Sequence, residues 1–547
     1  MPSPLPSVLG PADSGRLFAD AGITRSVVLD PSSRIDIPDC SNPPAGIPPE
    51  VAARAPRLPS LCAFPIPGDV PLPATTPFGW KEPRDPETAP APTGFPMVSI
   101  LPPEGVRRFL YPAAFPDFPL QSWNAGFLDC PKAADADGQV DWPAPAPFDA
   151  RTLSREPDLI VHGFYRYEWA DLLSRAKAIE TPDGGTRLAL DPAPSYGFCD
   201  INRCRVVNVF QALHAGRYYL DRANRLLFLA EPPDGTLSFA GDAAPPRISL
   251  DGAHDVVFRR CVFHDIRGTA LRARRCRNLV FEDCVFECIG GWALDIKNCT
   301  GFRMERCRLR DTAGGALSLH AGDRRTLEGG GALVRHCLFE RMGRLSSTYV
   351  PAIRLDGVGT TIERCEFADM PSSAIRYQGN SHAILRNFFH DCVLVSDDQG
   401  AVETFGDPSA RGTRIAGNVF QDIGANGDTL KCGRAGVRFD DMICENVVED
   451  NLFIRSSWKG FGAVQSHGGG LNTVRGNLLR DCSPPLSITP WPHERWTAAL
   501  ASDRVRKLIH GEAEIDSPAY RAAWPALATL ADGPGENIVE GNIILPK

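Results

Sequence analysis

The chain has 547 residues, of which 43% are hydrophobic and 23% charged, and this composition excludes collagen-like and wholly disordered proteins. The formal net charge is −8, from 58 basic and 66 acidic residues, so no basic field is present to hold a polyanionic backbone. Nucleic acid is therefore not an expected partner.

No stretch reaches the roughly 18 to 20 uninterrupted apolar residues that a membrane helix requires, so no membrane partner is expected. The first residues, MPSPLPSVLGPADSGRLF, have neither a basic region nor a continuous apolar region, so no signal peptide is visible. Seventeen cysteines, an odd number, fit reduced buried thiols better than a disulfide framework. These features favour a cytoplasmic location over a secreted or periplasmic protein that has lost its leader.

Proline divides the chain, because 31 of the 50 prolines lie in residues 1–150 and none lies between Pro246 and Pro351. Residues 1–90 are predicted to form an extended covering segment of loops and short edge strands, since proline neither continues helices nor fits central strands. Residues 91–247 contain alternating or aromatic-rich runs such as LIVHGFYRYEWADLL and RLLFLA, broken by PDGG and EPPDG turns. This pattern predicts a β-rich accessory domain.

Residues 248–547 repeat a phrase in which Cys or Asn precedes two apolar residues, as in EDCVF, ERCEF and EDNLF. Successive marks are separated by 22 to 33 residues, except for a last interval of 65, and apolar residues around each mark alternate with period two. Such periods predict a solenoid of strands, an all-β right-handed parallel β-helix of the pectate-lyase-like kind. The marked residues are Cys261, Cys284, Cys307, Cys337, Cys365, Asn387, Asn418, Asn451, Asn477 and Asn542.

The ladder of marked residues has a structural explanation. In a β-helix, equivalent residues of successive coils stack about 4.8 Å apart, so small thiols fill a tight corner and Asn amides bond along the axis. Neighbouring ladder cysteines are 23 or more residues apart, unlike the ligands of zinc sites. We therefore expect a buried ladder and no metal or other cofactor.

The long last interval contains a helix-forming insertion at about residues 490–532, near the C-terminus. It could cap the open end of the solenoid or shield a groove, and the need of every solenoid for a cap favours the first interpretation.

A second recurring phrase, such as GAVETF or AGVRFD, places polar residues one and three positions after an inward apolar residue, so they form two exterior columns. A solvated sheet with stacked ion pairs would explain the arginines. However, an aromatic residue among carboxylates, arginines and histidines is typical of a surface that binds sugars. The candidate substrate-binding residues on this face are His320, Arg354, Asp356, Arg376, Phe405, Arg438, Asp441 and His467.

Acidic residues are densest in two consecutive coils, which contain Asp397, Asp398, Glu403, Asp440 and Asp441. Glu403 and Asp440 lie one coil apart and two residues apart along the strand, a separation of about 8 Å. This distance leaves room for a water molecule between an acid and a base, as inverting glycosidases require.

The phrases DQGAVET and GVRFDDM, with GFPMVSILPPEG and GRYYLDRANRLLFLAEPP upstream, resemble those of a glycoside hydrolase family of β-helical α-L-fucosidases and xylanases. This resemblance covers most of residues 90–547. It implies Asp398 and Asp440 as the catalytic carboxylates, whereas strand geometry favours Glu403 with Asp440.

Three functions remain open on these residues. The leading prediction is a glycoside hydrolase that cleaves an oligosaccharide or polysaccharide with paired carboxylates. A polysaccharide lyase would instead use Ca²⁺ held by the acids and Arg376 or Arg438 as the base. A non-catalytic carbohydrate-binding β-helix is the third. The sequence does not indicate an oligomeric state.

Overall fold

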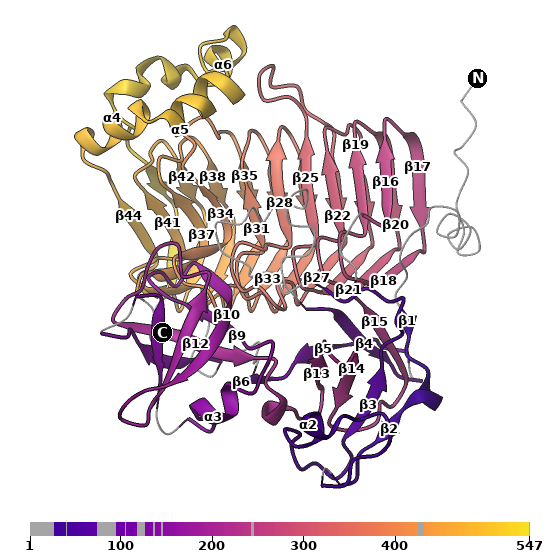
Figure 1. Ribbon diagram of the computed structural model, residues 1–547. Coiled ribbons are helices and arrows are strands. Elements are labelled where there is room, and N and C mark those ends of the chain that lie inside the picture. Colours follow the sequence, from indigo (N-terminus) through magenta and orange to yellow (C-terminus); the bar gives the residue numbers. More distant parts are fainter. Residues whose placement is uncertain are drawn as a thin grey trace, which may run out of the picture.

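The computed structural model describes residues 27–39, 41–73, 95–103, 105–117, 126–134, 137–143, 146–241, 246–424 and 431–545. These residues form five β-sheets, three of which run parallel along a solenoid and two of which belong to N-terminal units (Figure 1). The chain is thus a parallel β-helix with N-terminal β-rich units, as the repeats predict.

The first solenoid sheet carries the two exterior columns, and we call it the site sheet. Its strands, in order, are β16 (Ile248–Asp251), β19 (Leu271–Arg274), β22 (Leu294–Lys297), β25 (Leu317–Ala321), β28 (Ile353–Gly357), β31 (Ile375–Tyr377), β34 (Gln399–Phe405), β37 (Gly433–Asp440), β41 (Val464–His467) and β44 (Leu486–Thr489), with β40 (Ser457–Lys459) beside β37.

The second and third sheets complete each coil. The second contains β17 (His254–Arg259), β20 (Arg277–Glu282), β23 (Arg303–Glu305), β26 (Leu333–Arg335), β29 (Thr361–Glu363), β32 (Ala383–Leu385), β35 (Arg414–Ala416), β38 (Val447–Glu449), β42 (Thr473–Arg475) and β45 (Ile538–Glu540). The third contains β18 (Val262–Ile266), β21 (Val285–Ile289), β24 (Arg308–Thr312), β27 (Leu338–Glu340), β30 (Glu366–Ala368), β33 (Phe388–His390), β36 (Val419–Gln421), β39 (Leu452–Ile454), β43 (Leu478–Arg480) and β46 (Ile543–Leu545).

The Cys/Asn ladder lies at the corner between the second and third sheets and is buried from Cys261 to Asn477. Each corner turns at one residue of positive φ, for example Arg306 at 52°, directly before the ladder residue. The Cys337 sulfur accepts a hydrogen bond from the Cys307 N–H at 3.4 Å, and Asn418 Oδ1 accepts one from the Asn387 N–H at 2.8 Å. Thiol and amide side chains therefore both accept a hydrogen bond from the backbone N–H of the preceding ladder residue, which explains why both residue types occur in one ladder.

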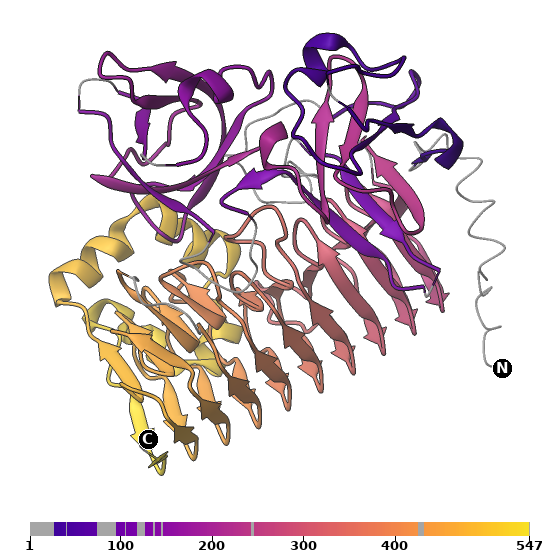
Figure 2. The same ribbon diagram turned by 90° about the horizontal axis from the view of Figure 1, so that it is seen from below.

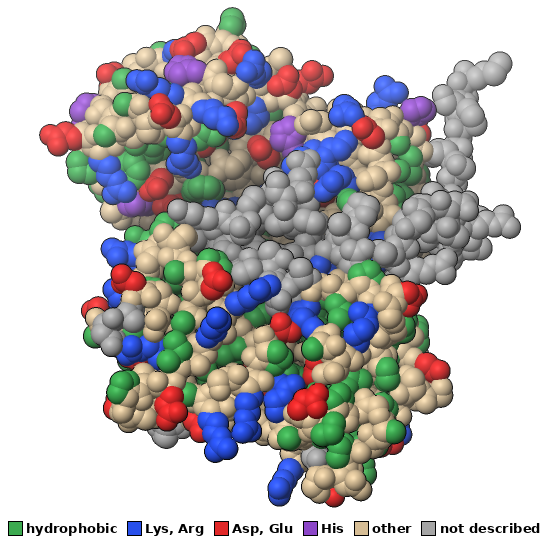
Figure 3. Space-filling model, in the orientation of Figure 1, with side chains coloured by type: hydrophobic (Ala, Val, Ile, Leu, Met, Phe, Trp, Pro, Cys, Tyr) green, Lys and Arg blue, Asp and Glu red, His purple; other side chains and the backbone are tan. Residues whose placement is uncertain are grey.

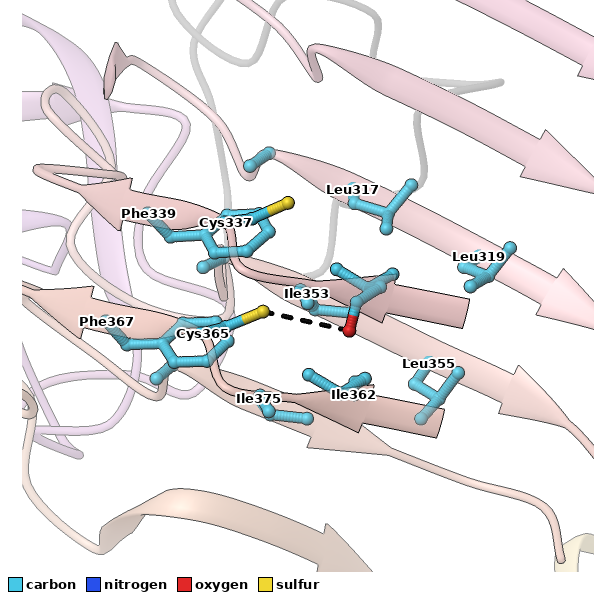
Figure 4. Packing of buried hydrophobic residues seen from close by; sticks show 14 of the residues in the cluster. Leu317, Leu319, Cys337, Phe339, Ile353, Leu355, Ile362, Cys365, Phe367 and Ile375 are labelled. Atoms are coloured by element: carbon cyan, nitrogen blue, oxygen red, sulfur yellow. Dashed lines mark hydrogen bonds between the residues drawn. The ribbon is translucent and has the colours of Figure 1, made fainter. Parts of the chain in front are cut away.

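Aromatic residues stack along the same axis inside the coils (Figure 4). The rings of Phe339, Phe367 and Phe389 lie 4.8 to 4.9 Å apart and within 10° of parallel, and the stack continues through Phe420 and Phe453. This spacing is the strand-to-strand repeat, so the inward alternation of the sequence is confirmed in the core.

Two smaller sheets form the N-terminal units. One runs β1 (Val27–Val28), β15 (Thr236–Ala240), β4 (Met97–Leu101), β5 (Arg108–Pro112), β13 (Arg217–Asp221), β14 (Leu226–Leu229), β3 (Cys62–Pro65) and β2 (Ile35–Asp36). The other runs β6 (Ala114–Phe115), β12 (Ile201–Val207), β9 (Ile160–Phe164), β10 (Asp171–Glu180), β11 (Thr186–Asp191) and β8 (Gln139–Trp142), with β7 (Leu128–Pro131) beside β12.

Within the described residues, the proline-rich segment supplies both edge strands, β1 and β2, of the first of these sheets, together with β3. In the described part of residues 1–247, four short helices accompany the two sheets: η1 (Pro31–Ser33), α2 (Pro49–Ala52), α3 (Ala150–Leu153) and η2 (Phe210–Ala212). The segments predicted separately as 1–90 and 91–247 therefore share a sheet and a core.

The N-terminal units lie alongside the solenoid (Figures 1 and 2). They pack on the turns that lead from the third sheet into the site sheet, where Phe127 and Phe164 share a cluster with Leu394 and Val395. These turns also carry Asp397 and Asp398, so the N-terminal units border the acidic coils.

The predicted insertion consists of α4 (His493–Ala501), α5 (Asp503–Arg506), η3 (Lys507–Glu512), α6 (Pro518–Ala523) and η4 (Pro525–Asp532). Its apolar residues pack against Met442 and Cys444, and Tyr520 Oη donates a hydrogen bond of 3.0 Å to Asn380 Oδ1. The helices therefore border the opposite margin of the site sheet (Figure 1).

The expectation that these helices cap the solenoid is wrong. In the last coil, Ile538, Ile543 and Ile544 are 49 to 59% exposed.

None of the helices in the described part of the chain is long and apolar enough to cross a membrane. On the face shown in Figure 3, basic and acidic side chains are interspersed.

Candidate active site

The outer face of the site sheet forms the floor of a cavity of about 1010 Å³. The N-terminal units supply one wall, through Trp169, and the helical insertion supplies the other, through Arg495. Every predicted site residue except His320 lines it. Among the described residues, those that line it are Trp169, Tyr349, Arg354, Leu355, Asp356, Arg376, Tyr377, Gln378, Asp398, Gln399, Glu403, Phe405, Cys432, Arg438, Asp440, Asp441, Phe461, Gln465, His467, Thr489 and Arg495.

The register of the site sheet follows the predicted columns. Glu403 pairs with Arg376 on one side and Arg438 on the other, and Phe405 pairs with Asp440. Val402 and Val437 point inward and are fully buried. The alternation that places these polar residues on the outer face is therefore correct, with no one-residue slip.

Arg438 connects the two aspartates that the family resemblance implies. Its Nη2 lies 2.7 Å from Asp398 Oδ1, and its Nη1 lies 2.9 Å from Asp440 Oδ2. Because one planar guanidinium group reaches both, these oxygens are at most about 8 Å apart. Asp398 and Asp440 therefore face a common space.

Asp398 is held at the cavity by the turn that precedes β34. Its φ is 57°, a left-handed conformation that Asp tolerates better than most residues. The neighbouring Asp397 carboxylate is buried and accepts hydrogen bonds of 2.8 Å from the N–H groups of Lys431, Cys432 and Gly433. Asp397 thus anchors the turn, while Asp398 projects into the cavity. The family resemblance pointed to Asp398, but nothing in the sequence showed that Asp397 anchors the turn.

The two aspartates have opposite pKa shifts. Burial raises the pKa of Asp398 to about 7, and the charges of Asp440, Asp397 and Glu403 add to this rise against the opposing effect of Arg438. Burial also acts on Asp440, but Arg438 and a hydrogen bond from His467 outweigh it, so the pKa of Asp440 is lowered. At pH 7 about half of the Asp398 carboxyl groups therefore carry a proton, and more do at lower pH, whereas Asp440 is ionised.

His467 stabilises the charge on Asp440 from the next coil. Its Nδ1 lies 3.2 Å from Asp440 Oδ1 and 3.0 Å from Asp441 Oδ1, and these hydrogen bonds raise the pKa of His467 to about 9. The Trp491 indole N–H donates to His467 Nε2 at 3.1 Å. This contact requires a lone pair on Nε2, so it favours the neutral imidazole and opposes the rise in the His467 pKa. In both the neutral and the protonated ring, Nδ1 carries a hydrogen that it donates to the carboxylates.

Asp440, Asp441 and His467 bring ligand atoms within 4.8 Å of one another, as a metal site would. However, the hydrogen on His467 Nδ1 occupies the position that would bind a metal ion. The two carboxylates alone offer few of the six or more oxygens that Ca²⁺ takes. This group therefore fits a hydrogen-bonded carboxylate pair better than a cation site.

Glu403 points to the outer face as predicted, but a residue of an exterior column is also expected to be accessible to solvent, and for Glu403 this expectation is wrong. It is 4% exposed, because Arg376 Nη1 lies 3.5 Å from Oε1 and the Gly400 N–H donates to Oε2 at 3.2 Å. Arg438 is likewise 7% exposed, since the two aspartates cover it. Neighbouring coils and turns thus bury groups that a bare sheet would expose.

Arg376 lies between two aromatic rings of the cavity. Its guanidinium carbon is 4.2 Å from the ring centre of Tyr349 and 4.2 Å from that of Phe405. Arg504 of the insertion lies on Phe405 at 5.4 Å. The cavity wall is therefore a series of alternating aromatic and cationic groups.

His320 lies outside this cavity and lines a second one of about 640 Å³. Asp356 lines both, so the two cavities adjoin along the site sheet. Arg354 lines the first cavity, and its guanidinium carbon lies 5.6 Å from the ring centre of the buried Trp292. His320 is therefore in the predicted column but away from the two aspartates.

Sequence reasoning missed the residues that come from outside the site sheet, chiefly Trp169, Tyr349, Trp491 and Arg495. The aromatic run YRYEW, which contains Trp169, was visible in the sequence. Nothing in the sequence placed this run beside the coils, because the contact depends on how the N-terminal units dock.

No protein-family model matches the sequence, and no curated protein matches it. A solved structure described as a glycoside hydrolase is similar, with a TM-score of 0.51 and 12% identity over 79% of this chain and 80% of that chain. The catalytic unit of a GH87 α-1,3-glucanase from Streptomyces thermodiastaticus gives a TM-score of 0.26 and 8% identity over 74% of this chain and 88% of that one. A tailspike of Pseudomonas phage phi297 gives a TM-score of 0.21 and 10% identity over 67% of this chain and 58% of that chain. At these identities the first likeness shows the β-helical fold alone.

Proposed function

We propose that the protein is a glycoside hydrolase in which Asp398 is the general acid and Asp440 the general base. The observation that carries the proposal is the opposite pKa shift of two carboxyl groups that contact one guanidinium group in a single cavity. The likeness in fold to a glycoside hydrolase agrees with this class but does not identify a sugar.

In the proposed reaction, Asp398 donates its carboxyl hydrogen to the glycosidic oxygen while the bond from that oxygen to the anomeric carbon breaks. Asp440 accepts a proton from a water molecule, whose oxygen forms the new bond to the anomeric carbon. One water is consumed, and the leaving alcohol and a sugar with a free anomeric hydroxyl are released. Exchange with solvent then restores the proton on Asp398 and removes it from Asp440.

The geometry gives less support to the lyase and to a hydrolase that uses Glu403 with Asp440. A lyase needs a base, but Asp440 and Asp398 raise the pKa of Arg438 despite its burial, so this guanidinium stays protonated. Glu403 is buried and bonded to Arg376 and Gly400, which suits a residue that positions Arg376 rather than one that exchanges protons.

The test compares phenyl and 4-nitrophenyl glycosides of a panel of sugars. Asp440→Asn should lower kcat/KM by on the order of 10²-fold or more for both leaving groups. Asp398→Asn should lower it more for the phenyl glycoside, because the poorer leaving group depends more on protonation.

Asp283→Asn, an exposed acid paired with Arg306 at the corner between the second and third sheets, is the matched control and should behave as wild type. Glu403→Gln compares the alternative pair. Suppose that Asp398→Asn lowers kcat/KM equally for the phenyl and 4-nitrophenyl glycosides, while Glu403→Gln lowers it more for the phenyl glycoside. The general acid would then be Glu403 and not Asp398. Unchanged hydrolysis in Asp440→Asn would contradict the mechanism.

A further inference from the structure

The loop between β9 and β10 brings an aromatic cluster to the edge of the cavity. Tyr167 and Trp169 stack with ring centres 4.7 Å apart and 13° between their planes. Tyr196 meets both rings edge-on at 5.2 and 5.3 Å, and Tyr349 of the solenoid meets Trp169 at 6.1 Å. Trp169 and Tyr349 line the cavity that contains the two aspartates.

This cluster is not part of a closed core. Tyr167 is 37% exposed, and Trp169, Tyr196 and Tyr349 are each only partly buried. Large aromatic rings contribute most to stability when they are fully buried, so a partly exposed group of four at a cavity is better explained by a ligand.

The loop is fixed to the solenoid on both sides of Trp169. Before it, the Glu168 carbonyl accepts a hydrogen bond of 3.1 Å from the N–H of Asp397, the residue next to Asp398. After it, the buried Asp171 carboxylate accepts hydrogen bonds from the Ser347 N–H at 2.7 Å and the Thr348 hydroxyl at 2.5 Å. Trp169 is therefore held between the turn of the proposed acid and the turn that carries Tyr349.

The rings lead directly to the charged groups of the site. Tyr349 packs on Arg376 at 4.2 Å, and Arg376 lies 3.5 Å from Glu403, which is beside Arg438 in the sheet. The face of a pyranose ring presents C–H groups that pack on an aromatic face, while its hydroxyls bond to carboxylates and arginines. A glycan chain would find both kinds of surface in succession along this wall.

We infer that Trp169 and Tyr349 form a sugar subsite through which the N-terminal unit binds a ring next to the one cleaved, so that the substrate is an oligosaccharide or polysaccharide. This inference rests on the proposed function for the position of the cleaved bond. The binding itself does not depend on hydrolysis, and the two are measured separately.

The first experiment measures binding to a glycan array that carries mono- to hexasaccharides. Wild type should bind chains of two or more units better than single sugars. Trp169→Ala should weaken that binding by on the order of 10-fold, and Trp169→Phe, which keeps a ring, should restore most of it. Phe388→Ala is the matched control, because Phe388 is also a partly buried outward aromatic residue, stacked on His390, but lies outside the cavity.

The second experiment compares 4-nitrophenyl glycosides of a monosaccharide and of the matching trisaccharide. The ratio of kcat/KM for the longer over the shorter substrate should fall about 10-fold in Trp169→Ala and stay unchanged in Phe388→Ala. Circular dichroism should show that both variants keep the β-helical fold.

The outcomes separate the two claims. Trp169-dependent binding without any hydrolysis by wild type would support the subsite and refute the proposed function. Array binding that Trp169→Ala leaves as in wild type, equal losses in Trp169→Ala and Phe388→Ala, or no binding of any glycan on the array would overturn the subsite.

Discussion

Arg438 contacts Asp398 and Asp440 through the two ends of one guanidinium group, so its charge alone does not separate the pKa values of the two carboxyl groups. The separation comes from their other neighbours. Asp440 gains His467 as a second hydrogen-bond donor, whereas Asp398 faces the charges of Asp440, Asp397 and Glu403 in a buried turn. The two acids therefore differ in state because they come from different elements.

The raised pKa of Asp398 also predicts an effect on stability. Between about pH 4 and 7 the folded protein holds a proton on Asp398 that the unfolded chain releases, so the free energy of unfolding falls as pH rises through this range. Asp398→Asn has no proton to lose there. We expect the difference in urea midpoint between pH 5 and pH 8 to be smaller in Asp398→Asn than in wild type.

Asp283→Asn again serves as the control for this measurement, because Arg306 lowers the pKa of Asp283, and it should keep the wild-type difference between the two pH values. An Asp398→Asn variant whose urea midpoint depends on pH as strongly as that of wild type would show that Asp398 is ionised throughout.

At this scale the acidic phrases predicted Asp398 and Asp440 as a pair, and both line one cavity, while the period-two pattern placed Glu403 on the outer face. It did not reveal that Glu403 is buried or that His467 supports Asp440. Both facts depend on the rotamers and turns of neighbouring coils, which alternation does not determine.

The corner ladder is the element that fixes the register of the coils. The side chain of Asn418 makes four hydrogen bonds. Its NH₂ group donates to the Ile384 carbonyl and to Asn451 Oδ1, and its Oδ1 accepts from the backbone N–H and the side-chain NH₂ of Asn387. Each bond is buried, so the loss of the side chain leaves unsatisfied polar groups in the coils on both sides.

Asn418→Ala should therefore lower the free energy of unfolding by about 2–4 kcal/mol. Asn418→Cys should cost less, because a thiol sulfur at this position accepts the backbone N–H of the previous coil, as Cys337 does for Cys307. Denaturant unfolding of both variants provides the measurement. A Cys variant as unstable as the Ala variant would show that the two ladder residues are not equivalent.

The repeats made this element predictable, since a marked residue every 22 to 33 positions requires a coil of about that length. The helical insertion was located correctly for a similar reason, because it lengthens one interval to 65. Its place beside the site sheet depends on long-range contacts such as the hydrogen bond from Tyr520 to Asn380, and local sequence patterns do not predict such contacts.

At the scale of the molecule, the β-helix acts as a floor between two walls. The N-terminal units contact the turns that enter the site sheet, and the insertion contacts the margin where its strands end. The cavity lies where both walls flank the acidic coils.

The helices leave the last coil open, and this predicts a contrast between two neighbouring positions. Leu479 and Ile544 pair in the third sheet, but Leu479 is fully buried and Ile544 is 50% exposed. Leu479→Ala should cost about 2–5 kcal/mol, whereas Ile544→Ala should cost roughly 1 kcal/mol or less. Equal losses in thermal or urea unfolding would show that another surface covers the last coil in solution.

The central claim is that Asp398 is a protonated acid and Asp440 an ionised base during glycoside hydrolysis. The most direct test is the pH dependence of kcat/KM between pH 3 and 9 on the best substrate of the aryl glycoside panel. The rate should be high between about pH 4 and 7 and should fall above pH 7 as Asp398 loses its proton, and this alkaline limb should disappear in Asp398→Asn. Activity that continues to rise above pH 8, or an alkaline limb that survives in Asp398→Asn, would contradict the account.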